Sequence, residues 1–129
     1  MPTVPTRLGD VSYIVRGQGP PVIMLHAALH DCHDFDHIAV ELAVHYQTFA
    51  VDWPWHGDSK GPSLVSRAAA DRPRAVELAS ILEDFVTVLD LPPAVIIGNS
   101  VGGFAAARLA ISTPSRVRAL VLVNSGGFT

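Results

Sequence analysis

The sequence contains little charge and a single cysteine. Cys32 is alone among 129 residues, so an internal disulfide is excluded, and this usage is typical of a reducing compartment. Charged residues make up 16% of the chain and hydrophobic residues 49%, the composition of a largely buried core. No cluster of lysine and arginine occurs, and the net charge is -3. This composition predicts that neither nucleic acid nor an anionic membrane surface is a partner.

The sequence also lacks a long apolar run. A membrane-spanning helix needs roughly eighteen or more consecutive apolar residues, and none is present. The first twenty residues include Arg7 and Asp10 among prolines and glycines, without the continuous apolar segment of a secretory signal. We therefore expect a cytoplasmic protein with no membrane partner, and the length predicts one domain.

Apolar segments with strand and helix periodicity alternate along the chain, which indicates an α/β fold with a mostly parallel sheet. The expected strands are 11–16 in a hairpin with 6–8, then 22–25, 47–51, 94–97 and 117–123. The expected helices are 35–45, 73–89 and 104–111, and Asp34 is predicted to cap the first of them. Sites in such folds lie beyond the carboxyl ends of the strands, which are here His26, Asp52, Ser100 and Asn124.

The most informative stretch is Gly98-Asn99-Ser100-Val101-Gly102, which follows an apolar strand and precedes an alanine-rich helix. A strand that enters a helix in so few residues needs a tight turn, and glycines two residues before and after the serine let strand and helix approach. This pattern predicts a nucleophile elbow. It would expose the Ser100 hydroxyl and direct the Val101 amide toward a developing oxyanion.

Three stretches, in the expected order and spacing, resemble the α/β-hydrolase superfamily. Residues 22–28 are similar to its strand followed by His-Gly-x, residues 52–59 to its Asp-x-x-Gly-x-Gly-x-Ser stretch, and residues 98–103 to its elbow. The resemblance implies that Ser100 is the nucleophile and that the amides of Val101 and Ala28 form the oxyanion hole. It implies no cofactor.

The chain departs from the family pattern near the predicted site. Ala27 replaces the usual glycine after His26, and Trp53-Pro54-Trp55 replaces the first glycine of the second stretch. Alanine is a small change, so the oxyanion loop is expected to survive. We expect His26, Ala27, Trp53 and Trp55 to border the substrate site, the tryptophans lining an apolar entrance; a surface tryptophan pair without a role is the alternative.

A larger departure is the absence of Asp, Glu and His after Ser100. A serine nucleophile needs a histidine as base and an acid that orients it, and in this fold both follow the serine. The resemblance therefore covers a partial domain over residues 1–129, truncated after the sixth strand, and this chain alone is expected to be inactive. His26 and His56 are upstream candidates for the base, although a histidine after this strand usually holds its loop.

Histidines and acidic residues between His30 and His37 also suggest a metal site. Two zinc ligands on a helix are spaced i, i+4, and His33 and His37 have this spacing on a helix only if the helix begins early. Solvated residues at a helix start explain this stretch better, so no metal is expected.

The resemblance leaves two functions open. One is a serine-dependent hydrolase of an ester, or of a carbon-carbon bond, in a small organic substrate; Asn99 before the serine is similar to the carbon-carbon branch. The other is a non-catalytic half-domain that acts as a binding or dimerisation module. It would use the edge strand 117–123, where we expect Leu120, Leu122 and Val123 to be partly exposed, to self-associate or to bind a C-terminal half.

Overall fold

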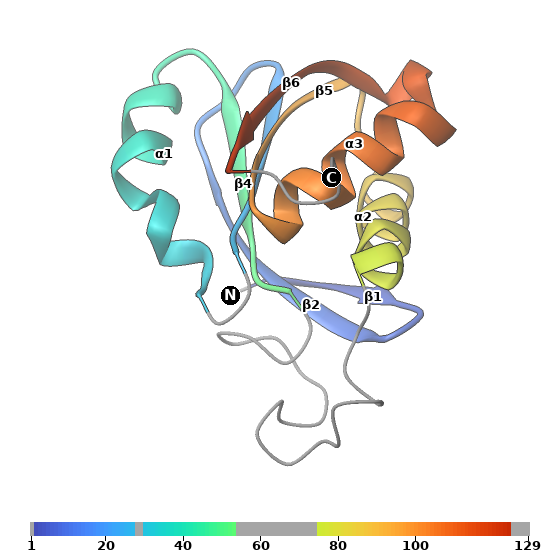
Figure 1. Ribbon diagram of the computed structural model, residues 1–129. Helices are drawn as coiled ribbons and strands as arrows, with labels where there is room; N and C mark the ends of the chain where they lie inside the picture. Colours follow the sequence, from blue (N-terminus) through green and yellow to red (C-terminus); the bar gives the residue numbers. More distant parts are fainter. Residues whose placement is uncertain (1, 28–29, 54–74, 125–129) are drawn as a thin grey trace.

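The computed structural model describes residues 2–27, 30–53 and 75–124 and shows one six-stranded sheet between helices (Figure 1). The strand order is β1-β2-β4-β3-β5-β6. The strands are β1 (Thr3–Thr6), β2 (Gly9–Arg16), β3 (Pro21–Leu25), β4 (Gln47–Val51), β5 (Ala94–Asn99) and β6 (Val117–Val123). The α/β fold class is thus confirmed.

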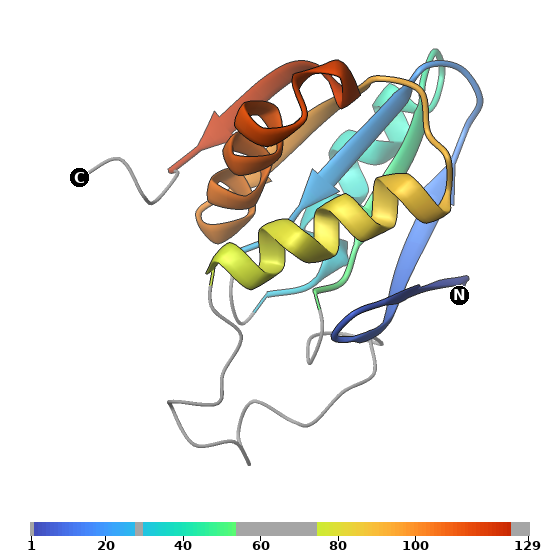
Figure 2. The ribbon, with the colours of Figure 1, turned by 90° about the vertical axis from the view of Figure 1, so that its right-hand side faces the viewer.

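The four strands from β3 to β6 are parallel, and β1 and β2 form an antiparallel hairpin that pairs with β4. β3 is apolar along its whole length and every residue is buried, as expected for a strand between two layers. Because the parallel strands all end at one edge of the sheet, the residues that follow them gather there. Figure 2 shows the ends of β3 and β6 and the first turn of α3 (Val101–Ser112) at this edge.

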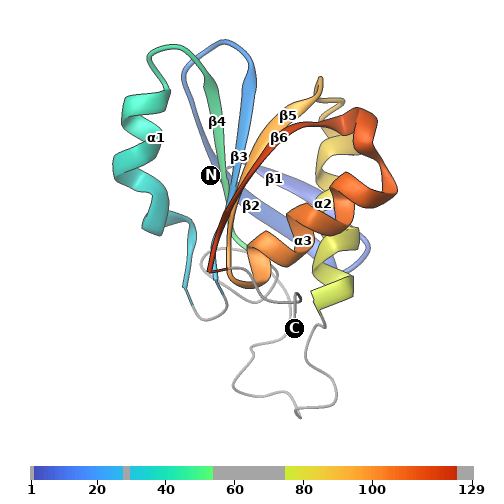
Figure 3. The ribbon, with the colours of Figure 1, turned by 45° about the horizontal axis from the view of Figure 1, so that its top comes forward.

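Within the described residues, three α-helices cover the sheet. α1 (Asp36–Leu42) lies on one face, and α2 (Ala75–Val88) and α3 lie on the other (Figure 3). Two short 3-10 helices, η1 (Cys32–Phe35) and η4 (Pro114–Arg116), precede α1 and β6. The predicted stripe of α2 is confirmed, since Leu78, Leu82 and Phe85 are buried. α3 buries small residues, which lets it lie close to the sheet; they are Gly102, Gly103, Ala105 and Ala106.

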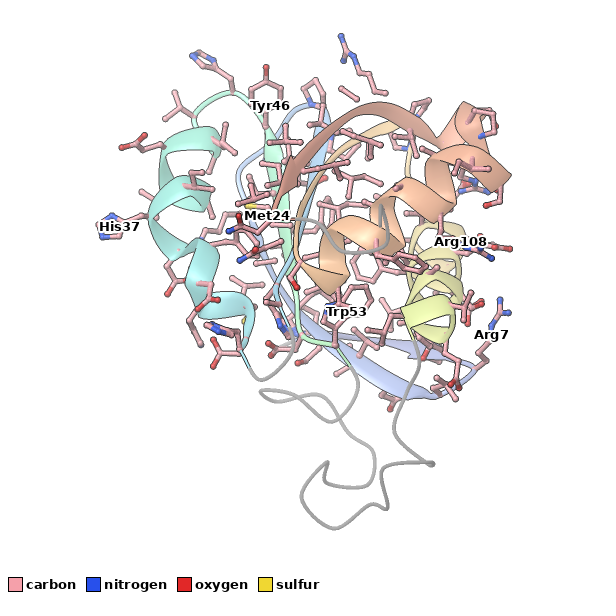
Figure 4. All side chains as sticks on the ribbon, viewed as in Figure 1. Arg7, Met24, His37, Tyr46, Trp53 and Arg108 are labelled. Atoms are coloured by element: carbon pink, nitrogen blue, oxygen red, sulfur yellow. The ribbon has the colours of Figure 1, made fainter. Side chains whose placement is uncertain are left out.

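The two faces contain cores of different size. On the α2 and α3 side the core extends from the hairpin to β5 and includes Leu25, Phe85 and Leu109. On the α1 side a smaller group packs beneath α1: Val22, Met24, Cys32, Ala39 and Ala50. Figure 4 labels Met24 in this smaller core and His37 pointing away from it.

Two sequence-based expectations need correction. The hairpin partner is β1, at residues 3–6 and not 6–8. Asp34 does not cap α1: a 3-10 turn comes first, Asp31 caps it by accepting from the His33 amide, and Asp34 instead pairs with His30. β6, whose apolar run is typical of a buried strand, is mostly exposed, with Leu122 39% and Val123 44% accessible. The expected partial exposure of this edge strand is confirmed.

None of the helices in the described ranges has both the length and the apolar character needed to cross a bilayer.

Candidate active site

The turn between β5 and α3, where the sequence predicts a nucleophile elbow, is tight and strained. Ser100 adopts φ 55° and ψ -114°, a left-handed conformation that non-glycine residues rarely adopt. A Cβ on Gly98 would lie 2.5 Å from the Gly102 carbonyl carbon, and a Cβ on Gly102 would lie 2.8 Å from Leu25 Cβ. Both distances are shorter than real contacts, so the two glycines are required where α3 crosses β5 and β3.

Backbone bonds hold the strained serine. The Ser100 amide donates to the Val123 carbonyl at the end of β6, at 2.9 Å, and the Ser100 carbonyl accepts from the Phe104 amide in the first turn of α3, at 3.1 Å. The Ser100 side chain makes no capping bond to the helix, and the residue is half-buried. Its hydroxyl is therefore not used to stabilise α3. Val101 is the first residue of that helix, where amides lack partners inside the helix.

His26, the first residue after β3, is fully buried and bonded to Trp53. Its Nε2 accepts from the Trp53 amide at 3.1 Å, and its carbonyl accepts from the Trp53 indole at 2.9 Å. Since Nε2 accepts, the ring proton lies on Nδ1, which donates to the Ala27 carbonyl at 2.6 Å. The lone pair that a general base would use is already engaged, so this geometry does not favour His26 as a replacement base.

Trp53 is also fully buried, and Figure 4 places it at the end of β4 on the side of α2 and α3. Substrate contact by the side chains of His26 and Trp53 stays a prediction, and their mutual bonds favour a positioning role. Ala27 is half-buried beside them. Ala28, Trp55 and His56 lie outside the described residues.

Asp52 connects three elements at this edge. Its Oδ1 accepts from the Cys32 amide at 2.7 Å and its Oδ2 from the Ser12 hydroxyl at 3.1 Å, while the Asp52 amide donates to the Ser12 carbonyl at 3.0 Å. Asp52 and Ser12 are each only 1% exposed. The sequence placed Asp52 at a strand end but gave no sign of these partners, because Ser12 is forty residues away and reads as an ordinary strand residue.

Cys32 is not suited to be a nucleophile. Its burial, together with the nearby Asp52 carboxylate, raises the pKa of the thiol to about 12. The thiolate, which is the reactive form, is therefore scarce at neutral pH.

The histidines around η1 are exposed and paired with carboxylates. His30 Nδ1 lies 2.8 Å from Asp34 Oδ2, and His33 Nδ1 lies 2.9 Å from Asp36 Oδ2. The bond to Asp36 raises the pKa of His33 and lowers that of Asp36. Within the described ranges, no group of three or more potential ligands could hold a metal ion. The pairs agree with solvated residues at a helix start.

A family model described as alpha/beta hydrolase fold matches residues 20–128, most of the chain. The chain belongs to the α/β-hydrolase fold family. Within this family it is 33% identical, over 123 residues, to the pimeloyl-[acyl-carrier protein] methyl ester esterase of Nitrosospira multiformis, covering 92% of this chain and 44% of that protein. It is 29% identical over 118 residues to an uncharacterized protein of Mycobacterium bovis, covering 92% of this chain and 33% of the other.

A solved enzyme structure has a similar fold. Est816, described as an N-acyl homoserine lactone degrading enzyme, superposes with a TM-score of 0.85 at 26% identity, covering 97% of this chain and 46% of that one. The chain thus spans less than half the length of each of these three proteins.

Proposed function

We propose that this chain is the nucleophile-bearing, N-terminal part of a single α/β-hydrolase domain that cleaves an ester of a small organic substrate. The observation that carries the proposal is the strained Ser100 between two glycines that no other residue could replace without displacing α3 or β3. Such strain persists only where the surrounding structure enforces it, and it is commonly found at active sites. The similarity to an esterase supports the same reaction class.

In the proposed reaction Ser100 Oγ attacks the carbonyl carbon, the Oγ proton passes to a base, and the carbonyl electrons move onto oxygen. The amides of Val101 and Ala28 would bind that oxyanion. Its collapse breaks the bond to the alcohol, which leaves with the proton, and water then hydrolyses the acyl-enzyme. Cleavage of a carbon-carbon bond by the same serine is the second possibility, suggested by Asn99 before it. We keep the cytoplasmic location as an expectation.

The base and its acid partner are proposed to lie outside these 129 residues. No Asp, Glu or His follows Ser100, and the Nε2 of His26 is engaged by Trp53. Without a base the serine stays protonated, so the chain alone should hydrolyse esters slowly. An oxyanion hole without a complete triad retains a residual acceleration of about 10³ to 10⁴ over water.

A p-nitrophenyl ester assay of the chain and of Ser100→Ala tests this proposal. We expect turnover below roughly 1 s⁻¹, with little further loss in Ser100→Ala, because the residual acceleration comes from the oxyanion hole and not from a serine without its base. Ser112→Ala, a serine at the far end of α3, is the matched control and should leave the rate unchanged. Rapid turnover that Ser100→Ala leaves unchanged would contradict a nucleophilic Ser100. Rapid turnover that Ser100→Ala abolishes would instead show that the chain contains its own base.

The alternative, a non-catalytic binding or dimerisation module, is favoured by β6. This strand forms one edge of the described sheet and carries exposed Val121, Leu122 and Val123. Unpaired apolar edges promote association.

Sedimentation at micromolar concentration tests the alternative. We expect the chain to associate, and we expect Val121→Lys to reduce the association. Ile111→Lys, at an exposed position of α3 away from β6, is the control and should have less effect. A monomer with a cooperative thermal transition would refute association through this edge.

A further inference from the structure

Most of the buried polar residues meet at one place. Within the described ranges four polar or charged side chains are buried: Ser12, His26, Thr48 and Asp52. Three of them, all except Thr48, lie together at the end of β4 with Cys32 and Trp53. A buried polar group is costly unless its hydrogen bonds are satisfied. The concentration of such groups at the edge that carries the elbow suggests a purpose beyond packing.

The bonds of this cluster hold both ends of the segment that connects β3 to η1. At the near end, His26 is bonded to the amide and to the indole of Trp53, at 3.1 and 2.9 Å. At the far end, the Cys32 amide donates to Asp52 Oδ1 at 2.7 Å. Asp52 and Trp53 are adjacent, so one dipeptide fixes where the segment begins and where it ends.

The Asp52 carboxylate is itself oriented by β2. The Ser12 hydroxyl donates to Oδ2, and the backbones of the two residues are bonded as well. Each carboxylate oxygen therefore has a partner from a different element. A carboxylate, which accepts at both oxygens, suits this position better than an apolar residue of similar size.

We propose that Asp52 is a positioning residue of the hydrolase, which fixes the far end of the segment after β3 through the Cys32 amide, with Ser12 orienting the carboxylate. The assignment of that segment to the oxyanion hole rests on the proposed function. The effect of Asp52 on the position of Cys32 can be measured without an enzyme assay.

Cys32 supplies the measurement, because it is the single cysteine of the chain and is fully buried at the braced end. An aromatic disulfide reagent reacts with the thiolate only when this end opens. At a fixed pH, dividing the observed rate by the rate for the denatured chain removes the ionisation of the thiol and leaves a normalised limiting rate that reports the opening equilibrium. This limiting rate rises when the hydrogen bond between Asp52 and the Cys32 amide is lost.

We expect Asp52→Ala to raise the limiting rate about tenfold or more, the shift that the loss of a charge-assisted hydrogen bond produces in an opening equilibrium. Asp52→Asn retains an acceptor for the Cys32 amide and should keep a nearly native limiting rate. Leu82→Ala, in the core on the other face, is the control for a general loss of stability. Hydrogen exchange of the Cys32 and Trp53 amides should follow the same order.

A limiting rate in Asp52→Ala no higher than that of Leu82→Ala, compared at equal global stability, would overturn the proposal. If Asp52→Ala fails to fold, Ser12→Ala replaces it, and a thiol as protected as the native one would overturn the proposal equally. Failure of the ester assay has no bearing on these rates, so the brace and the proposed reaction can be refuted separately.

Discussion

The two faces of the sheet are closed to different extents. Beneath α2 and α3, Leu82, Phe85 and Leu109 are each 1% exposed. On the other face α1 covers β3 and β4, but Val121 and Val123 of β6 remain 45% and 44% exposed. These two valines belong to the α1 side, because Val121 is paired with Ile97, which packs in the smaller core.

The difference shows that burial is set by the covering layer and not by the strand. β5 and β6 are similarly apolar, yet every second residue of β5 is buried and none of β6 is. The described helices cover one face more completely than the other. Val121 and Val123 are neighbours on this face of β6, and contiguous exposed apolar residues commonly mark interaction sites.

Gly102→Val should have the largest effect, because it disrupts the tightest contact on the closed face. The new side chain would collide with the Leu25 backbone, and overpacking of this kind costs roughly 1–3 kcal/mol or more. Thermal unfolding measures the loss. Arg108→Val, which places the same side chain on the exposed surface of α3, is the control and should cost less than about 1 kcal/mol. An unchanged melting temperature for Gly102→Val would contradict the close approach.

Truncations on the two faces compare them directly. Phe85 packs edge-on against Tyr13 and Phe49, with ring centroids 5.3 and 6.1 Å apart, so Phe85→Ala should cost about 3–5 kcal/mol. Val121→Ala, on the open face, should cost under about 1 kcal/mol because much of the valine is already in water. Urea unfolding of both variants tests the contrast. Similar losses would mean that β6 is covered in solution, for example by another molecule.

The smallest effect should come from the ion pair that ties the hairpin to α2. Arg7 donates to both Asp84 oxygens, through Nε at 3.0 Å and Nη2 at 2.6 Å. These bonds lower the pKa of Asp84, so their contribution is complete above the unfolded value of 3.8 and is lost as the pH falls through the folded value. The Arg7 side chain is 53% exposed, so Arg7→Met should cost only about 0.5–1 kcal/mol at pH 7.

That small cost should fade in acid, which denaturation curves at pH 7 and at pH values well below 3.8 can establish. Glu83→Gln, next to Asp84 in α2, is the control that changes a neighbouring charge without breaking the pair. A cost of Arg7→Met that stays constant with pH would show that the arginine acts by packing alone.

Local patterns predicted the strands, the helices and the tight turn at Ser100. The apolar run of β3, the stripe of α2 and the two glycines around Ser100 are each set within a few residues, so the sequence displays them directly. The cap of α1 was wrong because Asp31 and Asp34 compete within one turn, and both are good capping residues. Sequence alone does not decide which of them acts.

The polar cluster could not be predicted, because it depends on contacts across the chain. Asp52 meets Cys32 twenty residues away and Ser12 forty residues away, and only the sheet brings them together. The burial of His26 and Trp53 has the same origin. Their positions at strand ends suggested substrate contact, whereas the structure turns them toward each other. Predicted contacts of Ala28 and Trp55 remain predictions, since these residues lie outside the described ranges.

The bond from the Ser100 amide to the Val123 carbonyl has a consequence for the order of events during synthesis. β5 and α3 leave the ribosome before β6, so the turn that holds the serine cannot be locked when it is first made. It is completed only when the last residue of β6 emerges and pairs beside β5. Until then the nascent chain carries the serine in a turn that lacks one of its backbone restraints, and the strained conformation of Ser100 is acquired late.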